Sequence, residues 1–213
     1  MMQDLFAALP ARETIAEGAL LLRGYALPFE AELLAAIAEV TAAAPSRRMT
    51  TPGGFVMSVA MTNCGTAGWV TDRTGYRYAH EDPETGKAWP PMPPAFRRLA
   101  AEAAATAGYP GFAPDSCLIN RYEPGTRLSL HQDKDERDYT QPIVSVSLGL
   151  PAIFQFGGLA RNAPTARYPL QHGDVVVWGG PDRLRFHGVH PLAEGEHALT
   201  GACRFNLTFR RAL

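Results

Sequence analysis

The pattern of apolar and polar residues changes about half-way along the chain. In the first half, residues 28–45 and 93–108 carry apolar side chains at helical spacing. The first of these segments has an apolar stripe from Leu33 to Val40 and ends at Pro45. The second begins with two prolines and ends at Gly108. These signals predict two amphipathic helices.

Strand patterns occupy most of the remaining chain. Residues 53–65 (GGFVMSVAMTNCG) alternate in the manner of a strand, and residues 68–94 are rich in turn residues and aromatics, which predicts a long surface excursion. From residue 117 onward, short apolar runs alternate with turn signals: 117–122, 127–131, 143–150, 152–158, 166–170, 174–180, 183–189 and 203–210. This spacing predicts a mainly β protein with flanking helices, an α+β arrangement built around a β-sandwich or barrel.

Composition limits the possible classes of function. The 213 residues are enough for one domain, and the net charge of −1 gives no general attraction to polyanions. Three cysteines without paired spacing argue against a disulfide framework or a cysteine zinc site. No signal peptide is evident, and polar residues and glycines interrupt the most apolar region, 143–159, so we expect a cytoplasmic protein with no membrane segment.

The segment SLHQDKDE, residues 129–136, contains the first candidate chemistry. If the strand continues to Asp133, then His131 and Asp133 lie on one face and can bind a single ion. A solvated rim loop is the alternative for an isolated pair of this kind. His187 lies in another predicted strand, and two histidines with one carboxylate form the facial triad of non-haem Fe(II) oxygenases. A closed zinc site would need a fourth ligand, and none is evident.

A second candidate site lies on the last predicted strand, residues 203–210. One face of this strand carries Arg204, Asn206, Thr208 and Arg210, and the other face is apolar. A solvated sheet edge would explain the arginines alone. However, the strand 117–122 places Asn120 and Tyr122 together on one face in the same way. These side chains together predict a receptor for a small dianion with two carboxylates.

Longer runs of residues resemble the bacterial AlkB family of Fe(II)- and 2-oxoglutarate-dependent dioxygenases, which repair alkylated bases. The runs are TPGGFVMSVAMTNCG, GYPGFAPDSCLINRY, HQDKDE, IVSVSLGLPAIFQFGG, HGDVVVWGG, RFHG and RFNLTFR. The resemblance extends from about Asp4 to Arg210. It implies a jelly-roll double-stranded β-helix in a single domain, 1–213. Within this domain it implies a nucleotide-recognition lid at about 45–90 and a catalytic core at about 115–213.

The resemblance also implies a role for individual residues. The implied iron ligands are His131, Asp133 and His187. The implied contacts to 2-oxoglutarate are Asn120, Tyr122, Arg204, Asn206 and Arg210, and Arg210 is also implied in catalysis because it steadies the metal end of the site. The implied substrate contacts are Trp69, Tyr76, Tyr78, Asp135 and Arg161. Fe(II) would be the cofactor, with 2-oxoglutarate and O2 as cosubstrates.

The implied activity is oxidative demethylation of 1-methyladenine and 3-methylcytosine in single- or double-stranded DNA, by a monomer, with RNA as a further candidate substrate. The products would be the repaired base, formaldehyde, succinate and CO2. These methylated bases are cations, which suits the charge of Asp135 and the aromatic face of Trp69. Two alternatives remain open: a related oxygenase that acts on a substrate other than nucleic acid, and a non-catalytic nucleic-acid-binding jelly-roll module.

Overall fold

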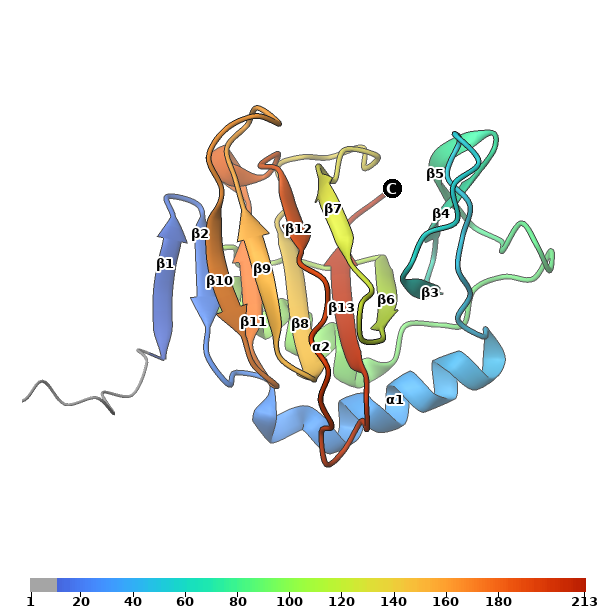
Figure 1. Cartoon of the computed structure of the whole chain (residues 1–213), viewed down its shortest axis with the longest axis horizontal. Coiled ribbons are helices and arrows are strands. Elements are labelled where there is room, and N and C mark those ends of the chain that lie inside the picture. The colour runs from blue at the N-terminus through green and yellow to red at the C-terminus, as the bar shows by residue number, and fades with distance from the viewer. Residues whose placement is uncertain (1–10) are drawn as a thin grey trace, which may run out of the picture.

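Two antiparallel β-sheets face each other, and two helices cover the outer side of the larger sheet (Figure 1). The computed structural model describes residues 11–213. Within that range, the larger sheet has the strand order β1 (Arg12–Ala16), β2 (Ala19–Leu22), β11 (Val175–Trp178), β8 (Ile143–Gly149), β13 (Arg204–Arg210), β6 (Ser116–Tyr122) and β3 (Ala60–Gly65). The smaller sheet has the order β10 (Ala166–Leu170), β9 (Ala152–Phe156), β12 (His187–Val189) and β7 (Leu128–His131). This is the predicted jelly-roll double-stranded β-helix.

The two predicted helices are confirmed as α1 (Glu30–Ala43) and α2 (Pro94–Thr106). Their apolar stripes pack on the larger sheet in a core that includes Leu33, Phe96 and Phe209. A second apolar core fills part of the space between the sheets and contains Trp178 and Phe154. The larger sheet is therefore covered on both faces, which explains why every residue of β8 is buried.

Strand β13 divides its side chains between these two environments. Phe205, Leu207 and Phe209 pack toward the helices. Because side chains alternate along a strand, the residues between them point into the space between the sheets. This second set is Arg204, Asn206, Thr208 and Arg210, and all four are buried. The predicted alternation of this strand is confirmed, and the alternative of a solvated edge is wrong because β13 lies inside the sheet between β8 and β6.

The strand predicted at 53–65 is shorter in the structure. Only Ala60–Gly65 joins the larger sheet, as β3. The preceding residues fold back on themselves at Gly53 and Gly54, where the Thr51 carbonyl accepts a hydrogen bond from the Gly54 amide and the Thr51 amide donates to the Phe55 carbonyl. The local turn satisfies backbone groups that the sheet would otherwise pair.

The aromatic excursion predicted at 68–94 contains a regular hairpin, β4 (Gly68–Asp72) and β5 (Gly75–Ala79). The two strands pair only with each other and form a separate two-stranded sheet beside β3 (Figure 1). In the connecting turn, the Asp72 carboxylate accepts from the Thr74 amide and binds Arg77. Strands outside the main sheets need little of the apolar alternation that identifies a buried strand, which explains why the sequence pattern did not predict this hairpin.

Two further features differ from the predictions. The strand predicted at 183–189 begins only at His187, and a short 3-10 helix, Gly180–Asp182, precedes it. Strand β7 ends at His131, so Asp133 lies in the following loop. Strands β1, β2 and β3 come from the first half of the chain and join the larger sheet. In residues 11–213, no helix is both long and apolar enough to cross a membrane.

We expect Phe209→Ala to lower the free energy of unfolding by about 3–5 kcal/mol, because it leaves a cavity beside Phe96 in the core under the helices. Phe209 is fully buried, whereas Phe55 is 77% exposed. The same change at Phe55 should therefore alter stability by less than about 0.5 kcal/mol. Urea unfolding of both variants measures the difference, and equal losses would contradict the packing described here.

Candidate metal and dicarboxylate site

A cavity of about 840 Å³ opens between the two sheets and extends toward the β4–β5 hairpin. The lining contains every predicted site residue except Tyr78. The polar face of β13 lies on one side of this cavity, and β7, the loop that follows it and β12 carry the candidate metal ligands on the other. The fold thus brings together residues that are far apart in the sequence.

The three candidate metal ligands lie at one place in this cavity. His131 ends β7, His187 begins β12, and the two residues face each other as partners in the antiparallel pair. Asp133 approaches from the loop after β7, with its carboxylate oxygens 3.7 Å from the Nε2 atoms of both histidines. One ligand atom from each residue lies within 4.8 Å of the other two. Two histidines and one carboxylate form a facial triad, which leaves coordination positions open on a bound metal.

Backbone contacts orient both imidazole rings. The Nδ1 atom of His131 lies 2.8 Å from the Ser129 carbonyl oxygen, and that of His187 lies 3.0 Å from the Arg185 carbonyl oxygen. A carbonyl oxygen only accepts hydrogen bonds, so each Nδ1 atom carries the proton. The Nε2 atoms, which lie beside the Asp133 carboxylate, then carry the lone pairs available to a metal.

Charge also favours the ligand form of these residues. Burial alone would raise the pKa of Asp133, but Arg210, and then His187 and His131, hold the pKa well below its usual range. Arg210 donates to the Asp133 Oδ2 atom from Nε at 3.0 Å and from Nη2 at 2.8 Å. Burial, followed by the effect of His131, lowers the pKa of His187 to about 4, so this ring is neutral at pH 7.

The second half of the cavity is a pocket between β13 and β6. These strands pair so that Arg204 is opposite Tyr122 and Asn206 is opposite Asn120. The guanidinium carbon of Arg204 lies 4.9 Å from the centre of the Tyr122 ring. The Asn120 amide donates to the Asn206 Oδ1 atom at 3.1 Å. The dicarboxylate residues predicted from the sequence thus lie side by side.

Several polar atoms of this pocket have no hydrogen-bond partner among the described residues. They are the Tyr122 hydroxyl, the Asn120 Oδ1 atom, Nε and Nη1 of Arg204, and Nη1 of Arg210. Burial raises the pKa of Tyr122 to about 12, so its hydroxyl remains a donor at neutral pH. Buried polar groups are normally paired, and a buried cation without a counter-ion is destabilising. A ligand with two carboxylates would supply acceptors for the four unpaired donors, which belong to Tyr122, Arg204 and Arg210, whereas the Asn120 Oδ1 atom is itself an acceptor.

Ser145 and Ser147 are functional residues that the sequence predictions missed. The Ser147 hydroxyl accepts from Arg204 at 2.9 Å, and the Ser145 hydroxyl accepts from Asn206 at 2.8 Å. Both serines interrupt the apolar strand β8 at alternate positions, a signal visible in the sequence. Because the serines are neutral, they orient Arg204 and Asn206 without neutralising the arginine.

Four of the five predicted substrate contacts line the cavity. The Trp69 indole donates from Nε1 to the Asp135 Oδ2 atom at 2.7 Å, and its ring stacks on Tyr76 with 5.8 Å between centroids. Arg161 also lines the cavity, with its guanidinium 5.8 Å from the Phe186 ring centre. An aromatic face and a carboxylate are thus held together opposite the candidate metal ligands.

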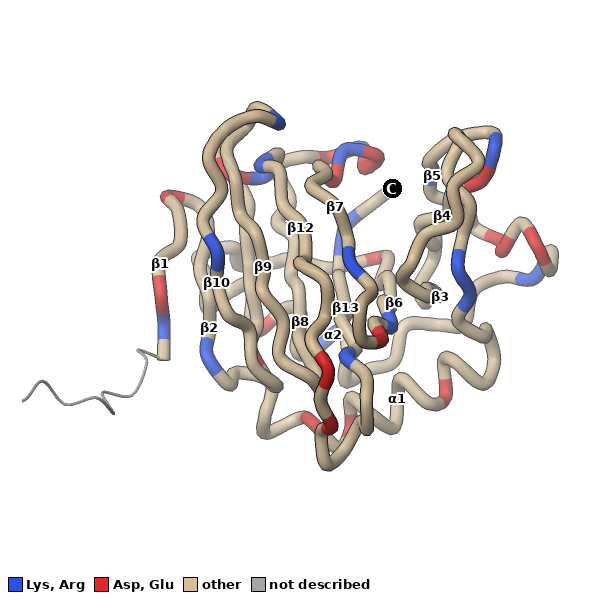
Figure 2. The backbone as a smooth tube through the Cα atoms, in the orientation of Figure 1, with Lys and Arg blue, Asp and Glu red and all other residues tan. Residues whose placement is uncertain are grey.

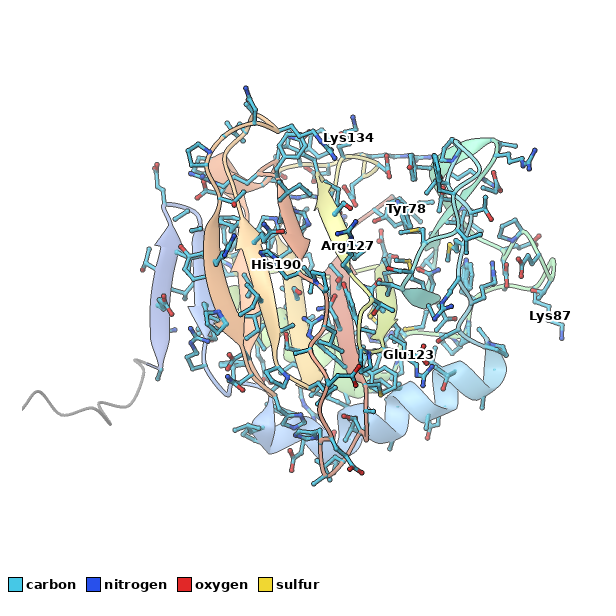
Figure 3. The ribbon with its side chains drawn as sticks, in the orientation of Figure 1. Tyr78, Lys87, Glu123, Arg127, Lys134 and His190 are labelled. Atoms are coloured by element: carbon cyan, nitrogen blue, oxygen red, sulfur yellow. The ribbon has the colours of Figure 1, made fainter. Side chains whose placement is uncertain are left out.

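Tyr78 is placed differently from this group. Its hydroxyl donates to the Glu136 Oε1 atom at 2.6 Å and does not line the cavity. Tyr76, two residues earlier on the same strand, lines the cavity, whereas the Tyr78 hydroxyl is taken up by Glu136. A direct contact between Tyr78 and a substrate base stays a prediction. Figure 3 labels Tyr78 between the hairpin and the jelly roll.

Comparison with known proteins places this site in a family. Residues 18–210 match the model of the 2OG-Fe(II) oxygenase superfamily. The chain is 60% identical to the alpha-ketoglutarate-dependent dioxygenase AlkB of Escherichia coli (strain K12) over 212 residues, which cover 99% of this chain and 98% of the relative. The chain belongs to the AlkB family of Fe(II)- and 2-oxoglutarate-dependent dioxygenases.

Two further relatives agree with this assignment. An AlkB homolog of Caulobacter vibrioides is 48% identical over 170 residues, which cover 79% of this chain and 76% of the relative. The solved structure of OsALKBH1 superposes with a TM-score of 0.83 at 26% identity, covering 94% of this chain and 99% of that chain. The shared fold extends over nearly the whole AlkB-type chain described here.

The residues present fit both groups that an AlkB-family enzyme requires. The triad of His131, Asp133 and His187 would hold Fe(II), which activates O2 when 2-oxoglutarate is bound. The unpaired donors of Arg204 and Tyr122 would hold the distal carboxylate of 2-oxoglutarate. The free Nη1 atom of Arg210 would contact the end nearest the metal.

We expect His131→Ala to weaken metal binding by at least about 100-fold, because loss of a ligand exceeds the effect of losing a residue that merely orients one. Turnover should be lost with it. Mn(II) titration and 2-oxoglutarate consumption provide the two measurements. His80→Ala, which changes an exposed histidine, is the matched control. Stoichiometric metal with full turnover in the His131 variant would overturn the assignment of this ligand.

We expect Arg204→Met to weaken 2-oxoglutarate binding by about 2 kcal/mol or more, which is about 30-fold or more, because the variant lacks the charged partner of the distal carboxylate. Anaerobic calorimetry of the Mn(II) protein measures this affinity. The control ligand is 2-oxobutyrate, which has no distal carboxylate and should bind both proteins alike. A similar loss for both ligands would show that Arg204 acts elsewhere.

Proposed function

We propose that this enzyme removes methyl groups from ring nitrogens of nucleic-acid bases, with 1-methyladenine and 3-methylcytosine as substrates. DNA is the proposed target, and RNA is a further one. The observation that carries the proposal is the hydrogen bond between Trp69 and Asp135 at the cavity wall. It holds a flat aromatic face and a negative charge together within the cavity that contains the metal triad.

This combination suits a methylated base better than an unmodified one. Methylation at N1 of adenine or N3 of cytosine makes the base a cation near neutral pH, which favours contact with Asp135 and with the face of Trp69. Stacking on an aromatic side chain contributes about 1–3 kcal/mol per base. The added methyl group also prevents normal pairing, so less free energy is needed to flip the damaged base out of a duplex.

The overall reaction consumes one O2 and one 2-oxoglutarate for each methyl group. Hydroxylation of the N-methyl carbon gives an N-hydroxymethyl base, which breaks its C–N bond and releases formaldehyde. 2-Oxoglutarate supplies the remaining two electrons and leaves as succinate and CO2. In this scheme the chain's own residues hold the base and orient the dicarboxylate. They also keep Asp133 ionised and His187 neutral, the forms that bind a metal.

Basic residues around the cavity support a nucleic-acid substrate. Arg127, Lys134 and Arg161 all contribute to its lining. Figure 3 labels Arg127 and Lys134 beside β7, and Figure 2 shows the acidic and basic positions of the loop that follows this strand. Contacts of this kind position a phosphate backbone without selecting its sequence.

We also place the enzyme in the cytoplasm and infer that it acts as a monomer. Cys64, Cys117 and Cys203 are free and buried, which is consistent with a reducing compartment. The metal triad and the dicarboxylate pocket lie in one cavity of one chain, so a single copy has the groups that the proposed reaction uses. We assign the residues at about 45–90 to nucleotide recognition and the jelly roll to catalysis.

The direct test uses the Fe(II) protein, 2-oxoglutarate and O2 with a short single-stranded oligonucleotide that contains 3-methylcytosine. We expect a mass loss of one methylene, with an equal amount of formaldehyde. Omitting either Fe(II) or 2-oxoglutarate should prevent both. Succinate formation without mass loss would instead indicate an oxygenase with a different substrate, and binding without turnover would indicate a non-catalytic module.

Asp135→Asn tests the charge of the base contact. Asparagine retains an oxygen that accepts from the Trp69 indole, so the variant removes the charge and keeps the hydrogen bond. We expect kcat/KM for 3-methylcytosine to fall at least about tenfold, equivalent to about 1.4 kcal/mol. Decarboxylation of 2-oxoglutarate without nucleic acid should fall much less. Equal losses in both assays would contradict a role in base recognition.

A further inference from the structure

Two residues that face each other across the β4–β5 hairpin both contact the loop after β7. Trp69 on β4 and Tyr78 on β5 are direct partners in the hairpin. Trp69 donates to Asp135 at 2.7 Å, and Tyr78 donates to Glu136 at 2.6 Å. Two adjacent carboxylates of the loop thus receive two adjacent donors of the hairpin. The first contact is at the cavity, and the second lies behind it.

Glu136 is buried and belongs to a network of charged groups. Its Oε2 atom accepts from Arg183 at 3.0 Å, and its Oε1 atom lies 3.4 Å from the Arg210 Nε atom. Its side chain is only 2% exposed and does not line the cavity. Donors from the chain therefore occupy both carboxylate oxygens, so Glu136 has a structural role and is not available to a ligand.

The same two arginines also hold the metal ligand Asp133. Arg210 binds the Asp133 carboxylate, and Arg183 donates to the Asp133 backbone carbonyl at 2.8 Å. Two routes therefore lead from Glu136 to Asp133, one through each arginine. The network contains two carboxylates and two guanidinium groups, so its charges balance. Tyr78 is the neutral group that connects this balanced network to the hairpin.

We propose that Tyr78 and Glu136 are positioning residues that couple the β4–β5 hairpin to the metal ligand Asp133. With the hairpin against the loop, the Tyr78 hydroxyl fixes one oxygen of Glu136, and Glu136 in turn fixes Arg183 and Arg210 around Asp133. Displacement of the hairpin removes this donor and loosens the network. The metal centre thereby responds to whether the hairpin covers the cavity.

Coupling of this kind is reciprocal. If hairpin closure favours the metal-binding arrangement of Asp133, then metal and 2-oxoglutarate must favour hairpin closure by the same factor. The effect can be measured without nucleic acid. The first measurement requires only that the protein bind a metal and 2-oxoglutarate. The second measurement also rests on the proposed demethylation of bases.

The first experiment measures amide hydrogen exchange of residues 68–79 in the full chain, with and without Mn(II) and 2-oxoglutarate under anaerobic conditions. In the wild-type protein, we expect the ligands to slow exchange in the hairpin by at least about threefold, a factor typical of one hydrogen bond. In Tyr78→Phe, the aromatic ring remains but the donor is lost, so the slowing should disappear. Tyr25→Phe is the matched control, since it removes a hydroxyl contact with Thr106 on the helix layer.

The second readout is the ratio of demethylation of 3-methylcytosine to decarboxylation without nucleic acid. Tyr78→Phe should lower this ratio at least about threefold, mainly through kcat. Glu136→Gln keeps an oxygen acceptor for Tyr78 but removes the charge that binds the arginines. It should weaken Mn(II) binding and abolish the ligand-dependent slowing in the hairpin.

Three results would overturn the proposal. One is wild-type exchange in the hairpin that does not respond to Mn(II) and 2-oxoglutarate. Another is a response that persists in Tyr78→Phe, and the third is a response that persists in Glu136→Gln. None of these results depends on methylated bases, so a failure of the proposed substrate assignment would be seen separately in the oligonucleotide assay.

Discussion

The ion pair between Arg210 and Asp133 joins the parts of this site. Arg210 is the last residue of β13 in the larger sheet, and Asp133 follows β7 in the smaller one. Their charges are buried, and each stabilises the other at hydrogen-bond distance. The pair therefore connects the two sheets across the cavity and keeps Asp133 ionised between two histidines. Without Arg210, burial would favour the protonated carboxyl group, which is a poor metal ligand.

The dicarboxylate pocket depends on the opposite condition, which is a charge left without a partner. Arg204 is buried, but its nearest polar neighbours are neutral: the Ser147 hydroxyl and the ring of Tyr122. An acidic residue in place of Ser147 would stabilise the folded chain and would compete with the ligand for the guanidinium group. The neutral serine orients Arg204 and leaves the charge of its guanidinium group unpaired, as binding of a carboxylate would require. Some stability of the free protein is thus given up for a pre-organised binding site.

The loop after β7 contributes residues both to the metal triad and to the contact with the β4–β5 hairpin. Asp133 turns toward the two histidines of the triad, Asp135 toward the hairpin and cavity, and Glu136 away from the cavity into the arginine network. Residues so close in sequence cannot move independently. A shift of the hairpin that changes the position of Asp135 or Glu136 therefore acts on a backbone that also carries Asp133. This short connection is the physical basis of the proposed coupling between the hairpin and Asp133.

The local sequence pattern was enough to predict several helices and strands of this protein. The apolar stripes and flanking prolines predicted both helices, and strict alternation predicted β13 with its polar and apolar faces. Tertiary structure decided what local patterns do not encode. Asp133 is in a loop because Arg210 and Arg183, 77 and 50 residues away, hold it there. Tyr78 points at Glu136 because the hairpin packs beside that loop. Side-chain direction in short strands and loops depends on distant partners, whereas periodicity depends only on the neighbouring residues.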